Sequence, residues 1–168
     1  MDNIIEYNNY LFESNKSNKS NSERTGTPKW SIWSKWRSLI NMSPSEIEKF
    51  LDSEQGKDSG LSRAEAKKEG GINTGRDSAR ALLRMIPSGS TWDKALENWS
   101  PLDWYWAGRQ VSFNSRMLGM KPVKKDPYID KNGDYTRWYK SMLIWGHNPK
   151  KPNRKILNKP NNLSKDNE

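Results

Sequence analysis

The sequence predicts an all-α fold: a compact bundle of about six short helices with one tight turn and flexible ends. Apolar side chains recur three or four residues apart, and residues that cap helices precede these runs. Nine Trp, six Tyr and three Phe occur among 168 residues, and most lie between positions 28 and 149. Only 32% of the chain is hydrophobic, but each buried ring removes roughly 150–250 Å² from water, enough to build a core. We therefore expect one helical domain over residues 28–149.

The two ends of the chain differ from this body in composition. Residues 1–13 carry three acids and no base, and Ile4, Tyr7 and Leu11 have helical spacing, which predicts a short amphipathic leader. Residues 14–27 are rich in Ser and Asn, a composition that buries little apolar surface and predicts a disordered linker. Residues 150–168 are rich in Pro, Asn and Lys and predict a disordered basic tail.

Start and stop signals place the helices of the body. Trp30, Trp33, Trp36 and Ile40 form one apolar stripe, as on an amphipathic helix. Capping boxes of the Ser-x-x-Glu or Ser-x-x-Asp type begin the helices at positions 43, 62 and 100. Glycines or prolines end several of them. The expected helical segments are 30–40, 43–51, 62–70, 76–86, 91–99, 100–118 and 135–145.

One turn stands out between the last two helices. The stretch from Asp130 to Asp134 contains Asn132-Gly133, a pair that favours a tight turn, which could join two very short strands. The stretch resembles a calcium-binding loop only in part, because the full ligand spacing and the closing glutamate are absent. We interpret it as a turn, and we expect no metal site.

The charge of the chain indicates an anionic partner. Lys and Arg number 29 against 20 Asp and Glu, a net charge of +9. Such a surplus suits nucleic acid, an anionic membrane surface or an acidic protein. No apolar run approaches the roughly 18 residues needed to span a bilayer, so we expect no membrane association. The absence of Cys excludes disulfides and thiol catalysis, and no cofactor motif occurs.

Three basic segments are candidate DNA-binding surfaces. Residues 62–86 have the outline of a helix-turn-helix, with three arginines four residues apart opposite an apolar face; a solvated face of an ordinary helix has the same pattern. The second segment covers residues 109–125, and the third lies in the tail. Such segments contact phosphates without reading sequence, which predicts non-specific binding of duplex DNA. The candidate residues are Arg76, Arg80, Arg84, Arg109, Arg116, Lys121, Lys124, Lys125, Lys150, Lys151, Arg154 and Lys155.

The catalytic inventory is thin. His147 is the sole histidine, and its place after a helix C-terminus favours a capping or packing role over catalysis. Asp126, Asp130 and Asp134 could bind magnesium in a nuclease, but aspartates in turns are ordinarily structural. No nucleophile motif or general base accompanies them. We therefore expect no catalytic residues and no enzyme activity.

The leader carries a resemblance. Residues 1–13, MDNIIEYNNYLFE, resemble the capsid-targeting peptides of internal head proteins in T-even-type tailed phages. Those peptides end in a pattern like aromatic-x-x-(Leu or Ile)-x-Glu, and the prohead maturation protease cuts after the glutamate. The resemblance implies that Leu11 and Glu13 belong to a cleavage signal and that Ser14 begins the mature protein. It also implies capsid proteins as partners and a location in the virion head, after synthesis in the host cytoplasm.

The C-terminal half carries a second likeness. Residues 109–120, the Gly133-x-x-Thr136-Arg137 motif and the stretch IWGHNP at residues 144–149 are similar to small uncharacterised viral and phage proteins. That group has no assigned activity, so the likeness implies context but no mechanism.

Three hypotheses follow. In the first, the chain is a phage virion protein that binds DNA through its basic surface without catalysis. In the second, tryptophans such as Trp30 and Trp33 dock the chain on a capsid, portal or host protein. In the third, the chain is a metal-dependent nuclease.

Overall fold

The helices of this protein confirm the all-α prediction. The computed structural model describes residues 29–68, 74–86 and 98–155, and within these ranges it contains seven α-helices and no strand. The helices are α3 (Lys29–Leu39), α4 (Pro44–Asp52), α5 (Glu54–Lys57), α6 (Arg63–Lys68), α7 (Gly75–Met85), α9 (Pro101–Gly119) and α10 (Arg137–Ile144).

Local capping chemistry explains where several helices begin. The expected capping boxes are present at Ser43, with Glu46, at Ser62, with Glu65, and at Ser100, with Asp103. Ser43 and Ser100 are followed by proline at the first helical position. Thr74 forms a further box with Asp77 at the start of α7. The expected helix over 91–99 lies almost entirely outside the described residues. The four-residue α5, which contains a glycine, was not expected, because so short a segment has no apolar periodicity.

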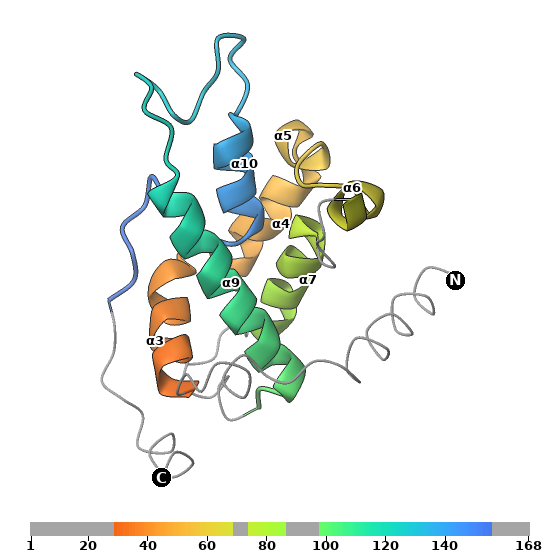
Figure 1. Cartoon of the computed structure of the whole chain (residues 1–168), viewed down its shortest axis with the longest axis vertical. Coiled ribbons are helices and arrows are strands. Elements are labelled where there is room, and N and C mark those ends of the chain that lie inside the picture. The colour runs from red at the N-terminus through yellow and green to blue at the C-terminus, as the bar shows by residue number, and fades with distance from the viewer. Residues whose placement is uncertain (1–28, 69–73, 87–97, 156–168) are drawn as a thin grey trace.

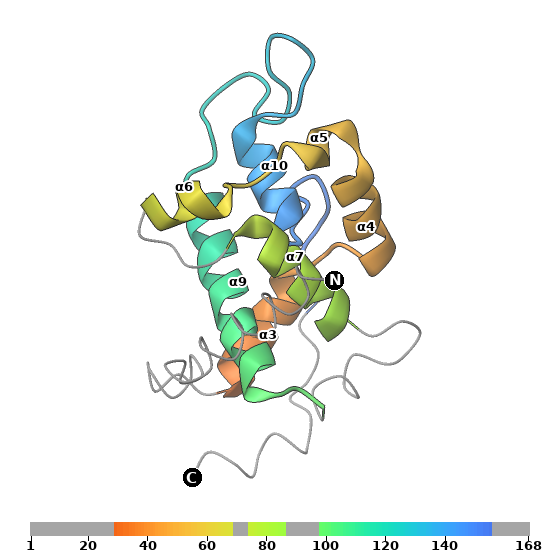
Figure 2. The ribbon, with the colours of Figure 1, turned by 90° about the vertical axis from the view of Figure 1, so that its right-hand side faces the viewer.

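The longest helix, α9, organises the bundle (Figure 1). α3 packs along it, and α7 lies against α4, α9 and α10. Seen from the side, α9 and α3 form one layer, and α4, α7 and α10 lie beside it (Figure 2). The core between them is rich in large rings from α3, α9 and α10, including Trp33, Trp36, Trp106 and Trp138. The tryptophans therefore supply the apolar volume that the low hydrophobic content seemed to lack.

A series of buried hydrogen bonds connects α3, α9 and α7. The indole Nε1 of Trp36 on α3 donates a 2.6 Å hydrogen bond to Oε1 of Gln110 on α9. The amide Nε2 of Gln110 donates in turn to the backbone and hydroxyl oxygens of Ser78 on α7, both at 3.3 Å. Gln110 is 0% exposed, so these bonds replace the water that its amide would otherwise bind.

The chain reverses sharply after α10. Gly146 has a φ of +82°, and a Cβ at this position would lie 2.6 Å from Cδ1 of Leu82. Both the left-handed backbone and the close approach require glycine, as expected for the residue that ends this helix. The turn at residues 130–134 is also present, but it contributes one isolated antiparallel bridge, Ile129 with Tyr135, in place of two short strands.

The first residues of the expected tail pack on the body. The backbone N–H of Arg154 donates to the carbonyl of Ser38 at 3.0 Å, and its Nε donates to the carbonyl of Ile40 at 3.0 Å. Burial lowers the pKa of Arg154, although the nearby Glu46 opposes this shift. Residues 150–155 thus belong to the folded unit, and residues 156–168 lie outside the described part.

Candidate nucleic-acid interface

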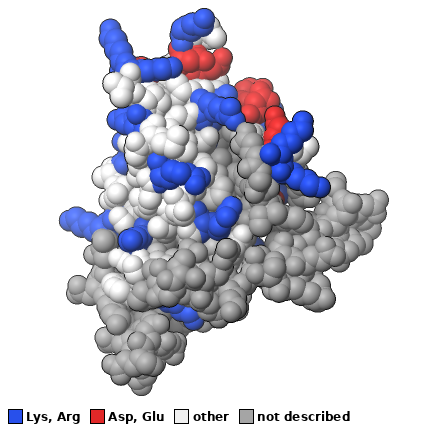
Figure 3. Space-filling model, viewed as in Figure 1, with Lys and Arg blue, Asp and Glu red and all other residues white. Residues whose placement is uncertain are grey.

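Charge is distributed unevenly over the folded chain. The described residues include 23 Lys and Arg against 11 Asp and Glu. Residues 104–155 alone hold 12 of these cations and only three acids, whereas residues 43–65 hold three cations and six acids. In Figure 3 the basic side chains are scattered over the face that contains α9, while the acidic ones gather at its upper edge. The molecule therefore has a basic side formed by α9, residues 121–125 of the α9–α10 connection and the start of the tail. The three acids of residues 104–155 all lie in the rest of the connection, at positions 126, 130 and 134.

The three arginines predicted as a recognition stripe all contact other groups of the protein. An Nη of Arg76 donates to the carbonyls of Gly56 and Lys57, both at 2.9 Å, at the end of α5. Arg84 donates to Oδ1 of Asp103 through Nε and Nη, at 3.1 and 2.7 Å. Arg80 lies 3.4 Å from Asp77 on the same helix. The contacts of Arg76 and Arg84 fasten α7 to its neighbours, and all three arginines use donors that phosphates would need.

The helix-turn-helix outline is only partly visible. Its two helices correspond to α6 and α7, but the turn falls on residues 69–73, outside the described part. The predicted apolar face of α7 is confirmed, because Ala79, Leu82 and Ile86 are buried. Contacts with α4, α9 and α10 surround much of α7, which leaves it less free to enter a DNA groove than an exposed recognition helix.

The cations that follow along the chain are differently placed. Arg109 and Arg116 lie two turns apart on α9, and three lysines follow in the connection to α10. Among the described residues, none of these five cations has a carboxylate within ion-pair distance. Aromatic rings hold two of them: Arg116 lies 5.7 Å from the Phe113 ring and Lys121 lies 5.7 Å from the Tyr128 ring. The five are Arg109, Arg116, Lys121, Lys124 and Lys125.

The tail cations divide into two kinds. Lys151 forms a 2.9 Å ion pair with Glu46. Partial burial raises the pKa of the Glu46 carboxyl, but the hydrogen bonds from Ser43 and Lys151 have the larger combined effect and lower this pKa. Lys150, by contrast, lies 4.8 Å from the Tyr128 ring and 5.2 Å from the Tyr139 ring. Lys155 is exposed. Lys151, like Arg154, therefore holds the tail in place, and Lys150 joins Lys121 around one tyrosine.

We call six residues the basic strip: Arg109, Arg116, Lys121, Lys124, Lys125 and Lys150. The strip runs from the middle of α9 through the α9–α10 connection to the tail. The nearest acid in sequence, Asp126, accepts hydrogen bonds from the backbone N–H groups of Tyr128 and Ile129, so its carboxylate is engaged with its own loop. The sequence did not predict that Tyr128 and Tyr139 lie beside Lys150 of the strip, because the three residues are far apart along the chain.

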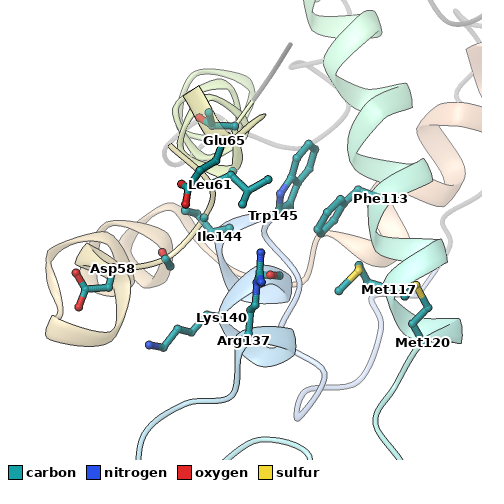
Figure 4. Close-up of a pocket in the computed structure, with 15 residues that line it drawn as sticks. Asp58, Leu61, Glu65, Phe113, Met117, Met120, Arg137, Lys140, Ile144 and Trp145 are labelled. Carbon is teal, nitrogen blue, oxygen red and sulfur yellow. The ribbon is translucent and has the colours of Figure 1, made fainter. Parts of the chain in front are cut away.

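A pocket of about 690 Å³ lies beside the strip, between the α5–α6 connection, the start of α7, the second half of α9 and α10. Phe113, Met117 and Met120 line its α9 side, and Asp58 lies on the opposite side (Figure 4). Hydrogen bonds from Ser62 lower the pKa of Glu65 at the rim, and the charge of Arg137 lowers it further. The lining thus combines charges of both signs with an apolar wall, unlike the single-sign strip.

His147 has a packing position, as the sequence predicted. Its side chain is 2% exposed, and its Nδ1 lies 2.6 Å from the backbone carbonyl of Leu39. Burial lowers the pKa of His147, and the hydrogen bond to Leu39 only partly opposes this. The imidazole is therefore neutral at pH 7, and as a neutral donor it joins the end of α10 to the end of α3.

The three aspartates of the nuclease hypothesis do not form a cluster. Asp130 accepts backbone hydrogen bonds from Asn132 and Asp134, and the carboxylate of Asp134 accepts from Gln55. In the described part of the chain, no three His, Asp or Glu side chains lie together as metal ligands would. These carboxylates stabilise the turn.

Other predicted features are buried or fall outside the described ranges. Trp33 is 1% exposed and belongs to the core, while Trp30 is half-buried and stacks on it at 5.1 Å between ring centroids. The leader, the linker and the cleavage residues Leu11, Glu13 and Ser14 lie outside the described residues. None of the described helices is both long enough and apolar enough to cross a bilayer.

Comparison with known proteins gives no relative. No family model, no curated protein and no solved structure matches the chain.

Proposed function

We propose that this chain is a phage virion protein that binds duplex DNA without catalysis, through the basic strip. The observation that supports this most strongly is the charge of residues 104–155, which contain 12 Lys and Arg but only three Asp. Most strip cations have no carboxylate partner in the described structure, so their charge is available to an external anion. Phosphates of DNA are such anions, spaced regularly along an extended backbone.

The mechanism is electrostatic attachment. Each Lys or Arg that contacts a phosphate releases a condensed counterion, and this release drives binding without reading sequence. Aromatic rings restrict the side chains of Arg116, Lys121 and Lys150 before DNA binds. Cations held over ring faces lose less conformational entropy when they contact a phosphate, which strengthens binding. The helical core supplies the rigid frame.

Salt dependence tests the DNA part. With the purified full chain and fluorescent duplexes of unrelated sequence, we expect anisotropy titrations to give similar affinities for all duplexes. If six strip cations each meet one phosphate, log K should fall with log salt at a slope of about −5. Affinity should then drop roughly a thousandfold between 50 and 200 mM salt. No binding at 50 mM salt, or an affinity independent of salt, would contradict the proposal.

The virion part of the proposal is supported by the leader. Its resemblance to capsid-targeting peptides suggests binding to capsid proteins during head assembly, followed by cleavage after Glu13. Removal of residues 1–13 deletes three acids and no base, which leaves the mature protein more basic. Mass spectrometry of protein from purified particles should find Ser14 as the first residue. An intact Met1 in mature particles would argue against targeting by this route.

A further inference from the structure

The connection between α9 and α10 exposes apolar side chains. Met120 is 62% exposed and Val123 is fully exposed, and no other large hydrophobic side chain of the described residues is exposed to this extent. Pro122 lies between them. Figures 1 and 2 show that this connection extends beyond the ends of both helices. We call residues 120–126 the projecting loop. Met120 also lines the pocket beside α9 and Pro122 is half-buried, but the exposed surface of Met120 and Val123 can be buried only by a partner.

The base of the loop is held firmly. The N–H of Met120 donates to the carbonyls of Arg116 and Met117 at 3.2 and 3.1 Å, and Nε1 of Trp138 donates to the Met117 carbonyl at 2.8 Å. At the far end, Asp126 accepts the N–H groups of residues 128 and 129. Pro122 fixes one backbone angle within the loop. Little conformational entropy would therefore be lost when the tip enters a binding site.

The loop carries cations on both sides of its apolar tip. Lys121 precedes Pro122-Val123, and Lys124 and Lys125 follow; all three are exposed. On α9, Arg109 and Arg116 continue this series over roughly 10 Å, at 1.5 Å per helical residue. A row of cations leading to a small apolar tip matches a phosphate backbone that borders a groove.

We propose that the projecting loop inserts Met120, Pro122 and Val123 into the DNA minor groove, where they part a base step while the flanking lysines contact phosphates. Side chains such as Met and Pro act as wedges of this kind in minor-groove proteins, and they kink the duplex by about 20–90°. The inference rests on the proposed function, and it adds a defined contact point and a bent DNA product. Pyrimidine–purine steps, which occur in duplexes of any overall sequence, should be the preferred points of insertion, because they cost least to open.

The test uses the full chain and a variant that loses the apolar tip but keeps every lysine, Met120→Ser with Val123→Ser. Energy transfer between dyes at the two ends of a short duplex should report a bend with the natural protein and a nearly straight duplex with the variant. The variant should bind about tenfold more weakly, because it cannot bury the tip. Its salt slope should be unchanged. The matched control, Met120→Leu with Val123→Ile, should keep the bend.

The outcomes separate this inference from the proposed function. If all three proteins bind the duplex with equal affinity and none of them bends it, the proposed insertion of the loop is wrong, while electrostatic DNA binding stands. Absence of duplex binding by any of them would overturn both. If the Ser variant bends DNA normally but loses binding to vesicles of mixed neutral and anionic phospholipids, the loop serves a lipid surface and the inference is wrong.

Discussion

Replacing Trp36 by Ala should lower the free energy of unfolding by about 3–5 kcal/mol, as for other fully buried large side chains. The side chain is 1% exposed, and its ring lies 4.8 Å from the Trp99 ring in an edge-to-face arrangement. The substitution leaves a cavity and also removes the partner of the buried Gln110 amide. Urea denaturation followed by far-ultraviolet circular dichroism would measure the change.

The destabilisation due to the lost hydrogen bond can be measured separately from that due to the cavity. Trp36→Phe keeps a ring but leaves Oε1 of Gln110 without its donor, which should cost about 1–3 kcal/mol. Gln110→Leu removes the oxygen that accepts the 2.6 Å hydrogen bond from Trp36 Nε1, at a similar cost. The double variant removes both ends of the bond, so its loss should be smaller than the sum of the two single losses. Additive losses would show that the hydrogen bond contributes nothing specific.

Trp30→Ala is the matched control on the same helix. Trp30 is only half-buried, so its removal leaves no closed cavity and should cost clearly less than Trp36→Ala. Equal losses at the two positions would contradict the assignment of Trp36 to the centre of the core.

The parts of this fold that the sequence predicts well are those set by neighbouring residues. The capping boxes at Ser43 and Ser100 involve partners three residues away, so the pattern is visible in the sequence itself. The end of α10 at Gly146 is equally local. Helix α5 was missed because its four residues carry no period, and its Ser53 cap was hidden next to the end of α4.

The uses of the basic residues could not be predicted in the same way. Periodicity places Arg76, Arg80 and Arg84 on one side of a helix, but it does not say what faces them. The partner of Arg84 is Asp103, 19 residues away, and Arg76 reaches a carbonyl 20 residues away. Lys151 meets Glu46 across 105 residues. Tertiary packing thus decides which of the predicted cations hold the fold together and which remain for a partner.

This division of the cations leads to the second large prediction. Reversing the charge at Arg116, Lys124 and Lys125 with glutamate should weaken duplex binding several hundredfold at 100 mM salt, since three phosphate contacts are lost. The slope of log K against log salt should become shallower by about 3. All three side chains are exposed, so the free energy of unfolding should change by less than about 0.5 kcal/mol per site.

A control of the same net charge distinguishes a site from a general attraction. Lys49, Lys67 and Lys68 are exposed cations on α4 and α6 that do not belong to the basic strip, and their reversal to glutamate changes the total charge equally. Because binding at a defined strip depends on contacts within a Debye length of about 10 Å, this second triple should lose at most a few-fold in affinity and keep its salt slope. If both triples weaken binding to the same extent, only net charge matters, and the strip is not the interface.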